Sequence, residues 1–208
     1  MAPDMAWFRA MAETADQIYA RVQAAGDLPA PSVTEWDVFP WVVRDGEIAP
    51  KPLAPPAPEE PRSGEDGVDC NLCGTDLPGV IWQDESWRVK HLKQSGLPLV
   101  LILEPLEHYD LPDLDEHQAA EFGVLTVRLV RIIESLPNIA RCHAMRIGDG
   151  AEHLHMWFLA RPQDLLSVRG SFSPDWDDIL PPGPAEIWRA DLAEVARKLA
   201  THGGEALI

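Results

Sequence analysis

Residues 153–159 read His-Leu-His-Met-Trp-Phe-Leu, and they are the most informative part of this sequence. The run is apolar, rich in strand-favouring aromatic residues, and ends shortly before a proline, so it predicts a β-strand. Because successive strand side chains point to opposite faces, His153 and His155 are expected on one face and Leu154 on the core face. Two imidazoles on one face can be two metal ligands, one ligand and one nucleophile, or two hydrogen-bonded histidines at a sheet edge.

A Cys-x-x-Cys knuckle at Cys70 and Cys73 adds to this pattern, and His108 follows a second apolar run. Two thiolates and two imidazoles are a standard tetrahedral zinc set. The knuckle could also be a redox pair, which normally opens a helix after a strand, or two unrelated free thiols. Since it follows a proline-rich segment and precedes turn-forming Gly, Asp and Pro residues, the pattern favours a metal turn.

Length and composition limit the protein class. The chain has 208 residues, 46% of them hydrophobic, which suffices for one globular core plus an extension. It shows neither a secretory signal nor an apolar run of roughly 18 residues, so no membrane association is expected. Three cysteines favour the reducing cytoplasm over a disulfide scaffold. The net charge of −17 disfavours nucleic-acid binding, but it does not exclude a small phosphorylated ligand, which needs only a local pocket of hydrogen-bond donors.

The sequence divides into four parts. Residues 1–28 have the apolar spacing of an amphipathic helix, expected over residues 5–25. Residues 29–66 are rich in proline and predict a mostly extended segment, whose tryptophan and valine side chains would lie along the domain surface. Residues 67–162 are the expected core domain. Residues 163–208 are expected to form a tail and a helix packed on that core.

Apolar runs and helical spacing predict the elements of the core. Strands are expected over residues 80–89 (two, with a turn between), 97–103, 140–147 and from 153, and helices over 116–136 and 185–200. Asp115 is the expected N-cap of the first helix, and Pro137 its stop. A Gly-Asp-Gly turn at 148–150 indicates a hairpin. The order strands, helix, strands, helix predicts an α+β class with a mainly antiparallel sheet.

Residues from about 70 to 162 resemble the histidine-triad (HIT) superfamily, especially branches with a Cys-x-x-Cys zinc site, including the relatives of galactose-1-phosphate uridylyltransferase. Four pieces carry the resemblance, in the family's order: Cys70-x-x-Cys73, the apolar strand into Pro105-x-x-His108, the Leu111-Pro-Asp-Leu114 lead-in with its long helix, and His153-x-His155. The resemblance implies a HIT-like fold. Because family members are usually dimers, it also implies a homodimer that shares the long helix or the N-terminal helix.

The resemblance further implies a structural zinc ion on Cys70, Cys73, His108 and His153. His155 would then be the nucleophile that attacks the α-phosphorus of a small nucleotide or nucleotide conjugate, giving a nucleotidyl-histidine. For this the imidazole must be neutral, and a backbone carbonyl on one ring nitrogen would fix its tautomer. Four protein ligands leave no open position on the metal. The alternative is a catalytic zinc ion on His153 and His155 with an open site.

Three further residues are candidate substrate contacts. Trp157 stands where HIT hydrolases have a third histidine and the uridylyltransferases a glutamine; its indole N–H could donate to a phosphoryl oxygen, or its ring could form a wall. Arg146 would neutralise charge on the phosphoryl oxygens, or pair with a surface carboxylate. Trp176 could stack on a base, or hold the tail against the core.

Two functions agree with these features. The first is a zinc-stabilised HIT-like nucleotidyl hydrolase or transferase that uses His155. The second is a HIT-fold protein without catalysis that serves as a binding or scaffold module. The intact His155 favours the first, whereas Trp157 and the acidic residues Asp149 and Glu152 before the motif favour the second.

Overall fold

The computed structural model describes residues 12–30, 38–74 and 77–208. At its centre is a six-stranded sheet in the order β6-β7-β5-β4-β3-β8, in which each neighbouring pair is antiparallel. The strands are β3 (Val80–Gln83), β4 (Trp87–His91), β5 (Val100–Pro105), β6 (Ile139–Met145), β7 (Met156–Pro162) and β8 (Glu205–Ala206). The predicted α+β class with a mainly antiparallel sheet is therefore confirmed.

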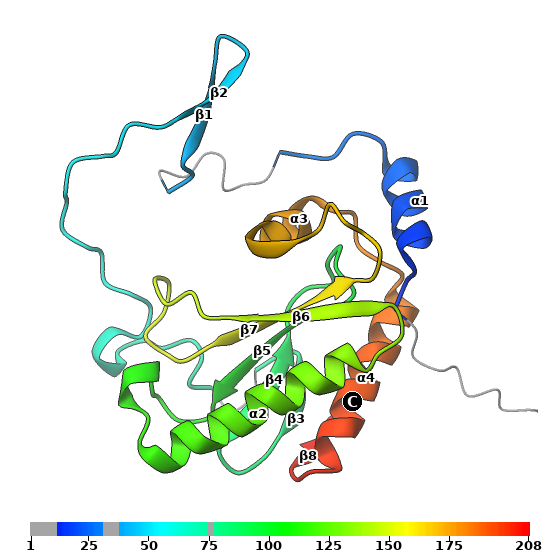
Figure 1. Ribbon diagram of the computed structural model, residues 1–208. Coiled ribbons are helices and arrows are strands. Elements are labelled where there is room, and N and C mark those ends of the chain that lie inside the picture. Colours follow the sequence, from blue (N-terminus) through cyan, green and yellow to red (C-terminus); the bar gives the residue numbers. More distant parts are fainter. Residues whose placement is uncertain (1–11, 31–37, 75–76) are drawn as a thin grey trace, which may run out of the picture.

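Helices cover both faces of this sheet (Figure 1). The long helix α2 (Glu116–Glu134) and α4 (Ala185–Ala200) pack on one face, while α3 (Ser173–Ile179) lies on the other. Asp115 caps α2 as predicted, since its side chain accepts a hydrogen bond from the Gln118 backbone N–H. The Gln118 side chain in turn accepts one from the Asp115 backbone N–H. None of the helices within the described residues has both the length and the apolar character needed to cross a membrane.

Strand alternation divides the core into two apolar clusters. Leu101 and Leu103 of β5 and Phe158 of β7 face α2 and α4, whereas Val100 and Leu159 face the side of α3. Because helices cover both faces, β5 is buried along its whole length, which explains its uninterrupted apolar sequence.

The segment before β7 differs from the prediction. The strand begins at Met156, so His153 and His155 precede it rather than lying within it. The Leu154 N–H bonds to the Tyr109 carbonyl at 2.7 Å instead of joining the sheet ladder, and both His153 and Leu154 are fully buried. The prediction that Leu154 points into the core is confirmed, but the placement of residues 153–155 in the strand is wrong, because this segment turns into the protein towards the residues that follow β5.

The terminal parts also differ from a purely sequence-based view. Within the described residues the first helix is α1 (Ala15–Ala25), which begins where Thr14 and Gln17 form a capping box. Residues 5–11 of the predicted helix lie outside the described residues, and so does Trp36 of the proline-rich segment. The proline-rich segment contains a hairpin, β1 (Trp41–Arg44) and β2 (Glu47–Pro50). Helix α3 was not expected in the tail.

Asp191 of α4 is a buried carboxylate whose titration should be measurable. It is fully buried, neither carboxylate oxygen has a hydrogen-bond partner among the residues that the structure describes, and burial raises its pKa to about 7. Between about pH 4 and pH 7 the folded chain retains a proton that the unfolded chain has released, so stability falls as pH rises through this window. Asp191→Asn is therefore expected to stabilise the protein at pH 8 by roughly 2–4 kcal/mol.

Urea denaturation at pH 5 and at pH 8 measures this difference. The gain from Asp191→Asn should be large at pH 8 and small at pH 5, whereas the exposed Asp149→Asn should change neither midpoint. An equal gain at both pH values would contradict the prediction.

Candidate metal centre and histidine site

Four predicted residues meet at one end of the sheet. The Sγ atoms of Cys70 and Cys73 and one ring nitrogen each of His108 and His153 all lie within 4.8 Å of one another. The knuckle lies between residues 67 and 80, His108 follows β5, and His153 precedes β7. Three separate parts of the chain therefore converge on one point.

The distances fit a tetrahedral metal site. Cys70 Sγ lies 3.5 Å from His153 Nδ1, and Cys73 Sγ lies 3.6 Å from His153 Nδ1 and 3.3 Å from His108 Nδ1. With bonds of about 2.3 Å to sulfur and about 2.0–2.1 Å to nitrogen, tetrahedral S and N ligands are about 3.5 Å apart. Three of the six donor pairs are thus already at the spacing that a bound ion would require, and all six lie within 4.8 Å.

The second nitrogen of each histidine is also constrained. His153 Nε2 donates to the Pro105 carbonyl at 3.0 Å, which leaves Nδ1 with its lone pair towards the thiols. Burial lowers the pKa of His153, which favours the neutral ligand form. His108 Nε2 has no hydrogen bond within the described residues, but it lies 4.0 Å from a Glu152 carboxylate oxygen.

The Cys73 thiol lies in an environment that disfavours its ionised form. Desolvation, followed by the hydrogen bond with Cys70, raises the pKa of Cys73 to about 11. Two adjacent thiolates would repel each other, and a metal ion removes that repulsion. The electrostatics of the cluster therefore agree with its geometry.

A buried ion pair on the sheet forms hydrogen bonds with the backbone of the knuckle. Arg88 of β4 is 2% exposed; it donates to Glu104 of β5 at 2.6 Å, to the Gly74 carbonyl at 2.8 Å and to the Leu72 carbonyl. Lys90 lies 2.9 Å from the other Glu104 oxygen. Sequence analysis missed this group, although charged residues in apolar strands are a recognisable signal, because buried charges are rare unless paired.

His155 has a defined tautomer. Its Nδ1 lies 2.6 Å from the His153 carbonyl oxygen. A carbonyl can only accept, so Nδ1 carries the proton and Nε2 keeps its lone pair, as a nucleophile requires. The backbone carbonyl expected to orient this ring is thus the carbonyl of the neighbouring metal-site residue.

The two tryptophans contact the same apolar cluster. Trp157 lies on β7 opposite Ile102 and Met145, and it packs with Trp176 of α3 against the cluster of Val100 and Leu159. Both rings are half-buried on the sheet face opposite α2. The structure thus brings two of the three candidate substrate contacts to one face.

Arg146 follows β6 and is engaged in an ion pair. Its Nη2 donates to Asp110 Oδ1 at 2.5 Å, and Arg62 donates to Asp110 Oδ2 at 2.8 Å. Burial alone would raise the pKa of Asp110, but the bonds from both arginines outweigh it and hold the pKa below its usual value. The Arg146 side chain is still 26% exposed.

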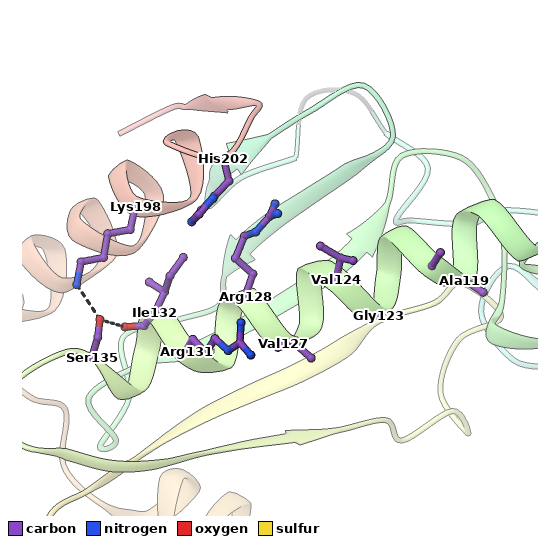
Figure 2. Close-up of a pocket in the computed structure, with 11 residues that line it drawn as sticks. Ala119, Gly123, Val124, Val127, Arg128, Arg131, Ile132, Ser135, Lys198 and His202 are labelled. Atoms are coloured by element: carbon purple, nitrogen blue, oxygen red, sulfur yellow. Dashed lines mark hydrogen bonds between the residues drawn. The ribbon is translucent and has the colours of Figure 1, made fainter.

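A large groove lies elsewhere (Figure 2). It measures about 710 Å³ and is lined by residues of α2 and of the C-terminal end of α4, among them the apolar Val124, Val127 and Ile132 and the cationic Arg128, Arg131 and Lys198. None of its lining residues belongs to the cysteine–histidine cluster or to the segment of His155. The groove is therefore separate from the candidate metal centre.

Fold and site together define an α+β protein whose antiparallel sheet carries a two-cysteine, two-histidine cluster next to a histidine with a free Nε2. No family model and no curated protein matches the sequence. Solved structures do match it. A hypothetical histidine triad nucleotide-binding protein from Sulfolobus tokodaii is 17% identical at a TM-score of 0.47, covering 64% of this chain and 93% of that chain.

Two further structures carry related descriptions. A HIT-like protein involved in cell-cycle regulation from Bartonella henselae is 13% identical at a TM-score of 0.46, covering 62% of this chain and 93% of that chain. A zinc-bound histidine triad family protein from Mycobacterium smegmatis is 19% identical at a TM-score of 0.45, covering 65% of this chain and 96% of that chain. All three of these solved structures are described as histidine triad or HIT-like proteins.

Proposed function

We propose that the protein is a zinc-stabilised HIT-like enzyme that transfers or hydrolyses the nucleotidyl group of a small nucleotide substrate through His155. The observation that carries this proposal is the hydrogen bond from His155 Nδ1 to the His153 carbonyl. This bond leaves the lone pair of Nε2 free, and it connects the nucleophile directly to a residue of the metal cluster.

Zinc is the ion that this donor set favours. Two thiolates and two imidazoles in tetrahedral spacing match zinc better than calcium or magnesium, which prefer oxygen ligands. Cys70, Cys73, His108 and His153 would hold the ion with no open position, so its role would be structural. When bound, the ion would fix the knuckle and the His153 segment relative to each other.

The chemistry of the reaction follows from the free nitrogen. His155 Nε2 attacks the α-phosphorus, a P–N bond forms, and the bond to the leaving oxygen or nitrogen breaks with the electron pair on that atom, which takes up a proton where it needs one. Water or an acceptor hydroxyl then attacks the phosphorus and releases a proton, and the P–N bond breaks with its electron pair on Nε2. Arg146 would balance charge on the phosphoryl oxygens, and the indole N–H of Trp157 would donate to one of them.

The two tryptophans proposed to contact the substrate lie on the same sheet face. Both border the cluster around Val100 and Leu159, and a base would stack on Trp176. Of the two acidic residues that could repel a phosphate, Asp149 is exposed and Glu152 is paired with Arg62 at 3.1 Å. This pairing draws the Glu152 carboxylate towards Arg62, which it shares with Glu65 and Asp110.

A substrate panel tests this proposal. The zinc-loaded protein would be assayed for nucleoside monophosphate release from dinucleoside polyphosphates, nucleotide sugars and nucleoside phosphoramidates. Release from one class identifies the substrate class. If folded, zinc-loaded protein releases nothing from any of them, the binding or scaffold function, which Trp157 in the third motif position favours, becomes the better interpretation.

Cytoplasmic location is part of the same proposal. Cys70, Cys73 and Cys142 are all free thiols in the structure, as a reducing compartment maintains them. A zinc site with two thiolate ligands requires the same reduced state.

The proposed homodimer would use the groove between α2 and α4. Val124 and Val127, which line this groove, are 52% and 48% exposed. Cations lie along one part of the groove, and the adjoining hollow is lined by acidic residues: Asp84, Glu85, Glu121 and Glu205. A two-fold axis across α2 would place the cations of one copy against the carboxylates of the other.

Val127→Glu is expected to convert this dimer to a monomer, because it places a carboxylate in the apolar centre of the interface. Sedimentation velocity of the variant and the wild type would show the change in mass. Leu166→Glu, which alters an exposed leucine outside the groove, should remain dimeric. A wild type that sediments as a monomer at all concentrations would contradict the proposed interface.

A further inference from the structure

Residues 62–66, here called the strap, lie against the candidate metal centre although they precede the core domain in sequence. Ser63 forms a parallel bridge with Ala151; its N–H donates to the Gly150 carbonyl at 3.1 Å, and its own carbonyl accepts from the Glu152 N–H at 2.9 Å. The end of the proline-rich segment is thus fixed, by backbone bonds, to the loop that leads into His153.

The strap approaches two of the metal ligands closely. Gly64 has φ +79°, and a β-carbon at this position would lie 2.9 Å from Cys70 Cβ, 3.1 Å from Cys70 Sγ and 3.2 Å from His108 Cε1. Only a residue without a side chain fits this backbone conformation at this distance. Gly64 therefore covers the Cys70 and His108 side of the cluster.

Arg62 connects the strap to two other parts of the chain, the segment after β5 and the loop between β6 and β7. Its guanidinium donates to Asp110 at 2.8 Å, to Glu152 at 3.1 Å and to the Gly148 carbonyl at 3.3 Å. Asp110 lies two residues after His108 and also accepts from Arg146. A planar guanidinium that bonds in several directions at once can hold these groups in fixed positions, which a point charge cannot.

Glu152 completes the connection to the metal ligands. One carboxylate oxygen accepts from Arg62, while the other accepts from the Asp66 N–H at 2.6 Å and lies 4.0 Å from His108 Nε2. At this distance the carboxylate of Glu152 acts on the His108 ring through its charge and forms no hydrogen bond with it. Because Arg62 positions Glu152, Arg62 acts on His108 through this electrostatic contact.

We infer that the strap is a clamp that slows release of the bound metal ion, with Arg62 as its positioning residue. The inference rests on the proposed metal centre and extends it, because it assigns a role to a segment outside the resemblance to histidine triad proteins. Removing the clamp should free His108 and Cys70 to exchange with a competing ligand, while leaving all four donors in the chain.

The test is the rate of zinc transfer from the loaded full-length protein to a chromogenic chelator. Arg62→Ala is expected to raise this rate by about 10- to 100-fold, the usual range for loss of a group that orients a metal ligand. Arg62→Lys should give an intermediate rate, since one of the bonds can be retained. Arg197→Ala, which removes an exposed arginine paired with Glu194, should release zinc at the wild-type rate.

Gly64→Ala provides a second variant that leaves all charges in place. It should also accelerate release, because the new methyl group displaces Cys70 or His108. Gly46→Ala is its matched control, since Gly46 has φ +83° but no atom within 4 Å of the added carbon. This pair separates backbone strain from contact with the cluster.

The outcomes distinguish the clamp from the metal centre itself. If the wild type binds one zinc ion and both Arg62→Ala and Gly64→Ala release it at the wild-type rate, the clamp is disproved and the metal centre remains. If the wild type binds no zinc, both the clamp and the metal centre fail. Faster release by both variants, with neither control affected, supports the clamp.

Discussion

His155→Ala is expected to abolish nucleotidyl transfer, lowering kcat by on the order of 10⁴-fold or more, because a covalent mechanism has no substitute for its nucleophile. The fold and the metal content should be unchanged, since the side chain is half-buried and its hydrogen bond is to the backbone of His153. Single-turnover release of nucleoside monophosphate, measured on the substrate found in the panel, gives the loss directly.

His155→Gly sharpens this prediction. Added imidazole can occupy the space of the missing ring and supply a nitrogen nucleophile, so activity should be partly restored in proportion to imidazole concentration. His117→Ala is the control, because His117 is 80% exposed on α2 and lies outside the site. Undiminished release by His155→Ala would contradict the histidine mechanism and favour a binding function for the same fold.

Cys73→Ser is expected to cause the largest loss of stability. A serine hydroxyl is a poor ligand for zinc, so the variant should lose the ion along with the folding free energy that its binding contributes. A loss of roughly 3–5 kcal/mol corresponds to a fall in Tm of about 10 °C or more for a chain of this size. Elemental analysis should find zinc in the wild type and none in the variant.

Cys142→Ser is the matched control for this experiment. Cys142 is not part of the cluster, and burial raises the pKa of its thiol to about 12, so it is an inert thiol. The control should keep its zinc and most of its stability. A chelator should lower the Tm of the wild type and of Cys142→Ser but not that of Cys73→Ser. Equal zinc content in all three proteins would rule out Cys73 as a ligand.

The four residues of the cysteine–histidine cluster could be selected from sequence because two cysteines at Cys-x-x-Cys spacing and histidines after apolar runs are typical metal ligands. The structure brings their ligand atoms within 4.8 Å of one another. The sheet and its two long helices could also be predicted from sequence, since periodicity and capping residues such as Asp115 are local signals.

Other features depended on contacts that no local pattern contains. The turn of His153 into the core follows from the hydrogen bond between Leu154 and Tyr109, which lie far apart in sequence. The partners of Arg62 could not be chosen from sequence among the 34 acidic residues of the chain. Arg146 illustrates the same limit, because its pairing with Asp110 depends on how two loops meet.

The wide spacing of the cluster along the chain affects how the protein is made. Cys70 and His153 are 83 positions apart, so during synthesis the knuckle leaves the ribosome well before its last histidine partner. An ion that met the early fragment would find two thiols and would be exchanged readily. Under the proposed function, tight retention begins only once β7 has joined the sheet. Metal loading would then mark chains whose folding is complete, and incomplete chains would present open thiols to the cell's quality-control machinery.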